Sequence, residues 1–164
     1  MLLAIEGIKK TKATYWYALD TKRWDLLKSV FTSDAIVDFR GGRDLKPGED
    51  YSQLPPVEQA LAQDDPTVAT GNAAIVVFMQ NGVKGWTTVH HGSAPIIDVL
   101  APDQATAIWP MFDILDSGVH IQTGYGHYHE TYRCQDETWR IQTLQVTRLR
   151  IDGNHPAHGA RVKK

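Results

Sequence analysis

Apolar residues recur at three- and four-residue steps in the first part of the chain. The repeat within residues 5–20 consists of Ile5, Ile8, Lys12 (through its aliphatic stem), Tyr15 and Leu19. This spacing predicts a helix with one buried stripe, ending near Asp20. A second helix is predicted after Thr21, a residue type that caps helix N-termini. Its buried side would hold Trp24, Leu27 and Phe31.

The middle of the chain carries turn signals and two further short helices. Thr32-Ser33-Asp34 predicts a turn, and Ile36–Phe39 predicts a strand. Residues 41–56 contain three Gly- or Pro-rich pairs and predict a long irregular loop. Such a loop is either a lid over a binding site or an idle surface excursion. One helix is expected after Pro56 and another over Gly71–Met79.

From Trp86 onward the pattern changes to runs of β-branched and aromatic residues separated by turn signals. The predicted strands are Thr87–Val89, Ile96–Leu100, Ala105–Leu115, Val119–Cys134 and Thr138–Ile151. Helices followed by long strands predict an α+β fold with a meander-like antiparallel sheet, which should curl strongly because the strands are long. Gly124 and Gly126, both in mid-strand, would help the sheet to curl. Helices closing a curled sheet would enclose a pocket.

Length, charge and cysteine content narrow the class of protein. The length of 164 residues predicts one domain over residues 1–164, with a mobile tail over residues 152–164. A net charge of −2 gives no reason to expect a nucleic acid or an anionic membrane as partner. Cys134 is the only cysteine, so a reducing, cytoplasmic location is expected. No apolar run in the sequence approaches the length that crosses a bilayer.

The sequence has no phosphate-binding loop, dinucleotide fingerprint or nucleophile elbow, so no cofactor is expected. Histidines gather in the second half instead, and one interpretation is a metal site. Its ligands would come from His90, His91, His127 and His129, with a carboxylate from Glu130 or Asp113. On a strand, however, Glu130 points to the opposite face from His127 and His129. Ordinary hydrogen-bonded histidines are therefore favoured over a metal site.

A second interpretation is general acid–base catalysis by a histidine that has a carboxylate behind it. Asp20 ends the first predicted helix, and Tyr15 lies five residues earlier, near the same mouth of the predicted pocket. From the residues alone, Asp20 could equally be a helix-end residue and Tyr15 a core residue.

Several short segments, taken in order, resemble the SnoaL-like branch of the nuclear transport factor 2-like superfamily. The matching segments are residues 15–25, 31–35, 89–92 with Pro95, 124–132, 139–141 and 147–149. They read YWYALDTKRWD, FTSDA, VHHG, GYGHYHETY, WRI and TRL. The resemblance runs from about Ile5 to Ile151. It implies the fold of that family, a cone-shaped α+β barrel in which N-terminal helices close a curved antiparallel sheet around a pocket. Individually the segments are weak signals, but jointly they are fairly specific for the fold.

The resemblance implies a set of site residues. In the dehydratase-like members a histidine acts as general base with an aspartate from the end of the first helix, matching His90 and Asp20 here. The bile-acid dehydratase of this branch adds residues matching Tyr15, Asp113 and Arg148. Tyr15, or a protonated Asp113, would donate a hydrogen bond to a developing oxyanion. Candidate substrate-binding residues on the pocket walls are Trp16, Trp109, Phe112, Tyr128 and His91.

The implied activity is that of a cofactor-independent lyase or isomerase acting on an apolar cyclic or aromatic small molecule. The resemblance also implies a homo-oligomer, most simply a trimer. Ser93 and Ile96 stand where many relatives carry a histidine and a glutamate, which leaves the substrate open. The alternatives are a non-catalytic binding or assembly module with the same cavity, and the metal-dependent enzyme described above.

Overall fold

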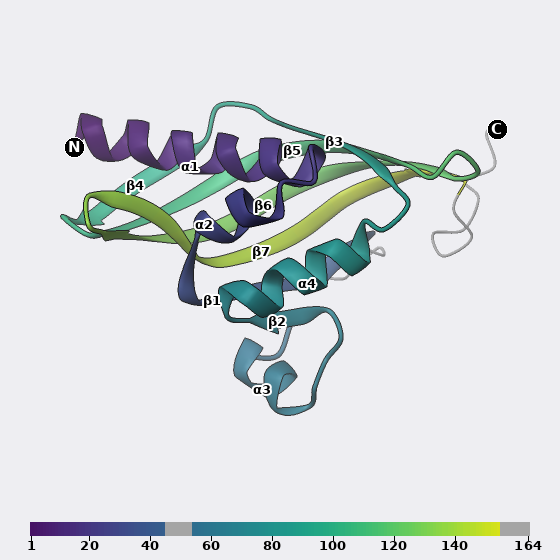
Figure 1. Ribbon diagram of the computed structural model, residues 1–164, viewed down its shortest axis with the longest axis horizontal. Coiled ribbons are helices and arrows are strands. Elements are labelled where there is room, and N and C mark those ends of the chain that lie inside the picture. Colours follow the sequence, from purple (N-terminus) through teal and green to yellow (C-terminus); the bar gives the residue numbers. More distant parts are fainter. Residues whose placement is uncertain (45–53, 155–164) are drawn as a thin grey trace.

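The protein folds as a curved sheet with helices on one side, seen in a computed structural model that describes residues 1–44 and 54–154 (Figure 1). Its helices are α1 (Leu2–Asp20), α2 (Trp24–Ser29), α3 (Val57–Ala62) and α4 (Asn72–Gly82). Its strands are β1 (Phe31–Asp44), β2 (Val68–Thr70), β3 (Thr87–Gly92), β4 (Ile96–Ala101), β5 (Gln104–Asp116), β6 (Ile121–Gln135) and β7 (Thr138–Gly153).

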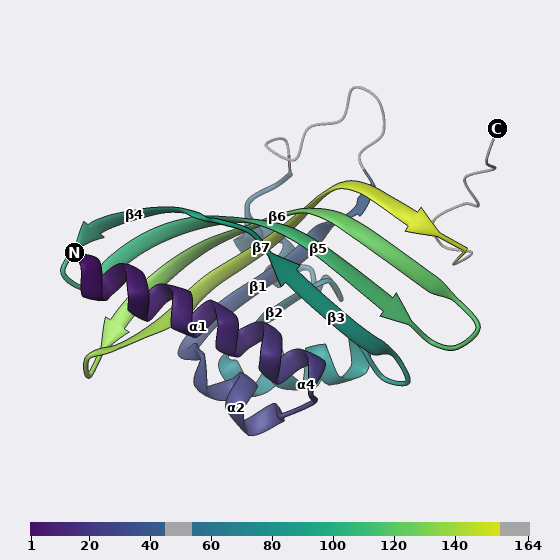
Figure 2. The ribbon, with the colours of Figure 1, turned by 90° about the horizontal axis from the view of Figure 1, so that it is seen from above.

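The strands of the described residues form one seven-stranded sheet in the order β2-β1-β7-β6-β5-β3. Strand β4 also pairs with β5, along the half that β3 leaves uncovered. The β1–β7 pair is parallel, and all the other pairs are antiparallel. Helices α1, α2 and α4 gather on one side of this sheet, which bends toward them (Figure 2). The predicted α+β class and curved sheet are confirmed, although the sheet stays open between β2 and β3.

Alternation along the long strands separates the core from the outer face of the sheet. The buried residues of β5 are Ala105, Ala107, Trp109, Met111 and Asp113. Successive side chains of a strand point to opposite faces, so these five face the helices and their neighbours face outward. The stripe predicted for α1 faces the core as well, because its residues Ile8, Lys12, Tyr15 and Leu19 are all buried.

Two glycines of β6 let neighbouring groups come unusually close. A Cβ on Gly126 would lie 1.9 Å from the backbone oxygen of Thr147, so no other residue fits without movement. The β6–β7 register shifts between Tyr125 and Gly126, beside both glycines. Such irregularities increase the local twist and bend of a strand, so the role predicted for the two glycines in curling the sheet stays a prediction.

The segment after α1 differs from the prediction. Helix α2 ends at Ser29, and Phe31 begins β1 instead of ending a helix, because it pairs with Ile141 of β7. Strand β1 runs through the predicted turn at residues 32–34. Thr21 does not cap α2; its hydroxyl donates to the backbone oxygen of Tyr17 and closes α1. Strand β2 had no signal in the sequence.

Two further predictions fall on residues outside those that the structure describes. The proposed lid over residues 41–56 begins as part of β1, but residues 45–53 are not described. Of the predicted tail, Asp152 and Gly153 belong to β7, and residues 155–164 are not described.

Candidate active site

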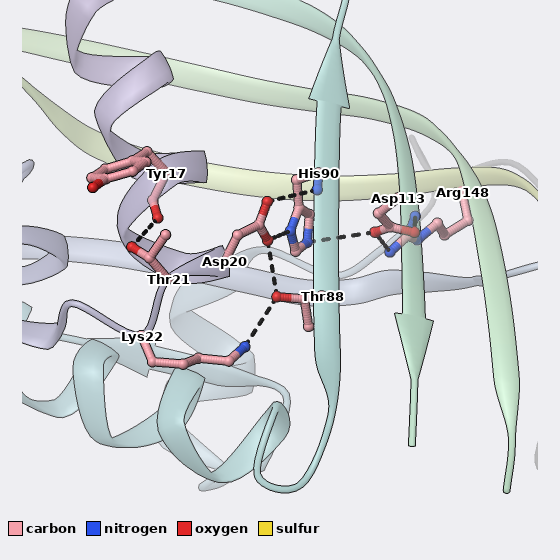
Figure 3. Close-up of polar contacts among 8 residues, drawn as sticks. All are labelled: Tyr17, Asp20, Thr21, Lys22, Thr88, His90, Asp113 and Arg148. Atoms are coloured by element: carbon pink, nitrogen blue, oxygen red, sulfur yellow. Dashed lines mark hydrogen bonds and ion pairs between the residues drawn. The ribbon is translucent and has the colours of Figure 1, made fainter. Parts of the chain in front are cut away.

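The last residue of α1 meets the middle of β3. The Oδ1 atom of Asp20 lies 2.6 Å from Nδ1 of His90, and Oδ2 accepts the backbone N–H of His90 at 2.8 Å (Figure 3). One carboxylate thus holds both the ring and the backbone of the histidine. The histidine side chain is only 7% exposed. The sequence-based pairing of Asp20 with His90 is realised as a direct contact.

A second carboxylate lies on the other side of the imidazole ring. Nε2 of His90 is 3.8 Å from Oδ2 of Asp113, which stands opposite His90 on the neighbouring strand β5. Arg148 of β7 donates two hydrogen bonds to Asp113, of 2.9 and 2.6 Å. Both carboxylate oxygens of Asp113 thus accept hydrogen bonds from one guanidinium group. In this arrangement Asp113 is an acceptor, whereas the resemblance suggested it as a donor.

Asp20 is stabilised as an anion by further donors. Thr88, two residues before His90 on β3, donates its hydroxyl to Oδ1 of Asp20 at 2.9 Å. Lys22 in turn donates to the Thr88 hydroxyl at 3.0 Å. Burial alone would raise the pKa of Asp20, but its hydrogen bonds with His90 and Thr88, together with the charge of His90, outweigh burial and hold that pKa below its usual value.

A cavity of about 220 Å³ opens beside the histidine. Its lining residues are Tyr15, Leu19, Phe39, Pro66, Thr67, Phe78, Met79, Gly82, Val83, His90, Asp113, Leu115, Tyr128 and Arg148. The polar groups gather at one end, and α4 with β1 supplies much of the apolar wall. A mainly apolar cavity with a few convergent polar groups is the usual form of a small-molecule site.

Two tyrosines complete the polar end of the cavity. Tyr15 and Tyr128 pack edge to face, with ring centroids 5.9 Å apart, and their hydroxyl groups are hydrogen-bonded. Burial raises the pKa of both phenols, and the neighbouring acidic groups raise the pKa of Tyr15 further. Both phenols therefore stay protonated, and because one donates to the other, one proton of the pair remains for a hydrogen bond to a bound oxygen atom.

A buried ion pair lies behind these tyrosines. Lys12 is fully buried, with Nζ 2.5 Å from Oε1 of Glu130 and 3.4 Å from the centre of the Tyr128 ring. Glu130 also accepts the hydroxyl of Tyr132. Burial lowers the pKa of Lys12 to about 8, against the opposing charge and hydrogen bond of Glu130. This pair could not be predicted from the sequence, because nothing local links residues 12 and 130.

Not every predicted wall residue reaches the cavity. Trp16 and Trp109 pack against each other at 5.7 Å, and Trp16 also contacts Tyr128, so the two indoles lie one layer behind the cavity wall. Phe112 and His91 lie on the opposite face of the sheet, where their rings stack at 6.4 Å. They adjoin Asp113 and His90 in sequence, so alternation along β5 and β3 turns them away. Their expected place on the pocket wall is wrong.

The four histidines of the metal interpretation are not brought together. His90 faces the cavity, whereas His91 and His127 line a shallow hollow on the outer face of the sheet. His129 lies beside His127, with ring centroids 6.1 Å apart. Among the described residues there is no cluster of three or more metal-ligating side chains. In that same part of the chain no helix has the length and apolar character of a membrane span.

The chain is similar to known proteins over most of its length. The sequence model of the SnoaL-like domain matches residues 1–145. A curated relative is the probable cyclase FGR4 of Gibberella zeae, which is 28% identical over 149 residues, covering 87% of this chain and 89% of the relative.

Solved structures share the fold at lower identity. A scytalone dehydratase-like protein from Novosphingobium aromaticivorans is 18% identical, with a TM-score of 0.69 over 99% of this chain and 95% of that one. A hexachlorocyclohexane dehydrochlorinase from Novosphingobium barchaimii is 15% identical, with a TM-score of 0.69 over 96% and 94% of the two chains. At these identities the likeness shows the fold alone.

Proposed function

The chain belongs to the SnoaL-like family, and from that membership we propose that it is a cofactor-independent lyase or isomerase of apolar cyclic or aromatic small molecules. One observation carries the proposal. His90 lies between two carboxylates at the polar end of an apolar cavity. An imidazole held in this way suits proton transfer, because its tautomer is fixed and its charged form is stabilised.

In the proposed reaction His90 is the general base. Asp20 accepts a hydrogen bond from the N–H at Nδ1, which leaves Nε2 unprotonated and available as the base. Nε2 removes a proton from a carbon next to a carbonyl, and the C–H electron pair moves into an enolate. Asp20 and Asp113 then stabilise the imidazolium. In an isomerase His90 returns the proton to another carbon; in a lyase the enolate expels a leaving group from the adjacent carbon.

The developing oxyanion needs hydrogen-bond donors, and in this proposal the tyrosines of the cavity provide them. Tyr15 and Tyr128 line the same cavity as His90, and their raised pKa values keep them protonated. Donors fixed before the reaction stabilise such an anion without reorganisation. Arg148 holds Asp113 in place through two hydrogen bonds, which makes Arg148 a positioning residue in this mechanism.

The test is exchange of hydrogen for deuterium at the carbon next to the carbonyl, because it follows proton removal whatever reaction comes next. One- and two-ring ketones would be incubated with the protein in D2O and followed by NMR. We expect His90→Ala to lower the exchange rate about 10²–10⁴-fold, the usual contribution of general base catalysis. Asp20→Asn should also lower it. His91→Ala, on the outer face, is the matched control and should keep the wild-type rate.

Full exchange in His90→Ala would refute the proposed base. The rival function is a non-catalytic binding module with the same cavity. Native mass spectrometry that finds a tightly held, unreacted small molecule, with no exchange in any ketone, would favour that rival.

We also propose that the protein is a cytoplasmic homo-oligomer, most simply a trimer. The family resemblance supports the oligomer, and the single cysteine supports the compartment. Sedimentation equilibrium tests the first point, with three times the mass of one chain as the expected result. Cell fractionation tests the second.

A further inference from the structure

A second cation approaches the candidate site from the side opposite Arg148. The ammonium group of Lys22 donates to the Thr88 hydroxyl at 3.0 Å, and that hydroxyl donates to Oδ1 of Asp20 at 2.9 Å (Figure 3). The same Oδ1 contacts Nδ1 of His90 at 2.6 Å. The three contacts join a lysine outside the cavity to the histidine inside it.

The donors and acceptors in this series allow only one direction. An ammonium group can only donate, so the oxygen of Thr88 must accept from Lys22. The Thr88 proton then points to Asp20, whose ionised carboxylate can only accept. Asp20 also accepts the hydrogen bond from Nδ1 of His90. The positive charge of Lys22 thus acts on the carboxylate through one buried hydroxyl, which belongs to a residue only 3% exposed.

The backbone at Lys22 gives independent support. Its φ of 58° lies in the left-handed region, at the position just past the end of α1. The N–H of Arg23 donates to the oxygen of Ala18 at 2.8 Å, the bond of a Schellman helix end. This position normally holds glycine, since a side chain is disfavoured there. The lysine therefore stands where helix termination alone would favour glycine.

We propose that Lys22 and Thr88 form a charge-balancing arm that offsets the carboxylate behind His90, as Arg148 offsets the carboxylate in front of it. The charged groups facing His90 are Asp20 from α1, Lys22 from the turn after α1, Asp113 from β5 and Arg148 from β7. Tyr128 of β6, which is protonated, shares the cavity.

The charges of these groups balance only when His90 is neutral. Two cations and two carboxylates then surround an uncharged imidazole, whereas a protonated His90 leaves one positive charge in excess. Without the arm, the two carboxylates would favour the imidazolium, which cannot act as a base. Lys22 and Thr88 are thus positioning residues. In assigning them a catalytic purpose the inference rests on the proposed function, but the charge balance itself can be measured without a substrate.

The experiment is an NMR titration of His90 in the full chain, with its signal assigned by its absence in His90→Gln. Lys22→Met should move the titration midpoint of His90 upward by roughly 0.5 pH unit, the effect of removing one nearby charge that acts through water. Thr88→Val removes a hydrogen bond to Asp20 but no charge, so it should move the midpoint upward by less. Lys22→Arg and Thr88→Ser keep the donors and should keep the wild-type midpoint. Lys28→Met removes the same charge from the exposed side of α2 and should leave the midpoint in place.

A further variant at residue 22 separates the effect of the charge from any effect on folding. Lys22→Gly removes the charge but suits the left-handed backbone, so we expect the same midpoint shift with a melting temperature no lower than wild type. An unmoved midpoint in Lys22→Met and Lys22→Gly would overturn the arm. If the His90 midpoint shifts in these variants but the wild type exchanges deuterium into no ketone, the charge-balancing arm is supported and the proposed catalysis is refuted.

Discussion

Gly124 of β6 is the residue on which the Arg148–Asp113 pair depends. A Cβ at this position would lie 2.1 Å from Nη1 of Arg148 and 2.4 Å from Oδ1 of Asp113. These groups hold each other by two hydrogen bonds and cannot move apart without breaking them. The absence of a side chain at Gly124 is therefore what lets the ion pair lie this close to β6.

We expect Gly124→Ala to lower the free energy of unfolding by about 1–3 kcal/mol, the usual effect of overpacking a tight site. Gly82→Ala is the control, because a Cβ there meets nothing within 4 Å. Urea denaturation of both variants measures the difference. Equal stability of the two would mean that the ion pair can shift to make room.

At the residue scale the sequence could be interpreted only in part. Asp20 and His90 were identified through a family resemblance, since a helix-end aspartate and a strand histidine are common on their own. Thr88 and Lys22 carried no signal, because their role depends on where β3 docks against the end of α1. Phe112 and His91 were predicted on the wrong face of the sheet, because each is one residue away from a residue that faces the cavity.

At the scale of elements, the Lys12–Glu130 pair fixes α1 against β6. Both side chains are fully buried. Removing one partner leaves a buried charge alone and typically costs about 3–5 kcal/mol, whereas removing both is often tolerated. We expect Lys12→Met to lower the free energy of unfolding by an amount in that range. Lys12→Met/Glu130→Gln should recover most of this free energy, because the amide oxygen of Gln can still accept the hydrogen bond from Tyr132. A double-mutant cycle in urea measures the coupling, and simple additivity of the two changes would contradict it.

The same pair makes stability depend on pH in the alkaline range. Lys12 has a pKa of about 8 in the folded protein against 10.5 in the unfolded chain. Between those values the unfolded chain binds more protons, so the free energy of unfolding rises with pH. From pH 7 to 9.5 the wild type should gain about 2 kcal/mol relative to Lys12→Met/Glu130→Gln. Tyrosine titration is common to both proteins and cancels. A constant difference between them would show that Lys12 keeps its proton.

Elements whose partners lie close in sequence were predicted well, and those with distant partners were not. Strands β5, β6 and β7 pair with their neighbours in sequence, and their alternation marks them clearly. Strand β1 pairs in parallel with β7, about a hundred residues later. Its local sequence reads as a turn at residues 32–34, and that long-range pairing overrides the local preference.

At the scale of the whole molecule, the site exists only when the helices are docked on the sheet. Its polar groups come from α1, β3, β5, β6 and β7, and α4 supplies much of the apolar wall. Phe78 and Met79 of α4 could not be assigned to the cavity from sequence, because their helix is apolar on most sides. Any ligand in the cavity touches both layers and should therefore stabilise the entire fold.

The size of the cavity limits which ligands can bind in it and stabilise the fold. A cavity of about 150 Å³ holds a single benzene ring, and the cavity here is about 220 Å³. One- and two-ring carbonyl compounds should therefore raise the melting temperature, and four-ring compounds should not. At a ligand concentration of about 100 times Kd the stabilisation is about 2.7 kcal/mol, or roughly 5–10 °C for a chain of this length.

A variant that fills the cavity makes this prediction specific. Val83→Trp places an indole in the cavity from the end of α4 and should abolish the rise in melting temperature. Val77→Trp adds the same group to the exposed side of the same helix and should keep it, because Val77 is 54% exposed. A rise that survives in Val83→Trp would place the ligand elsewhere on the molecule. The cavity would then not be the binding site, because the fold would be stabilised although no ligand lies between the helices and the sheet.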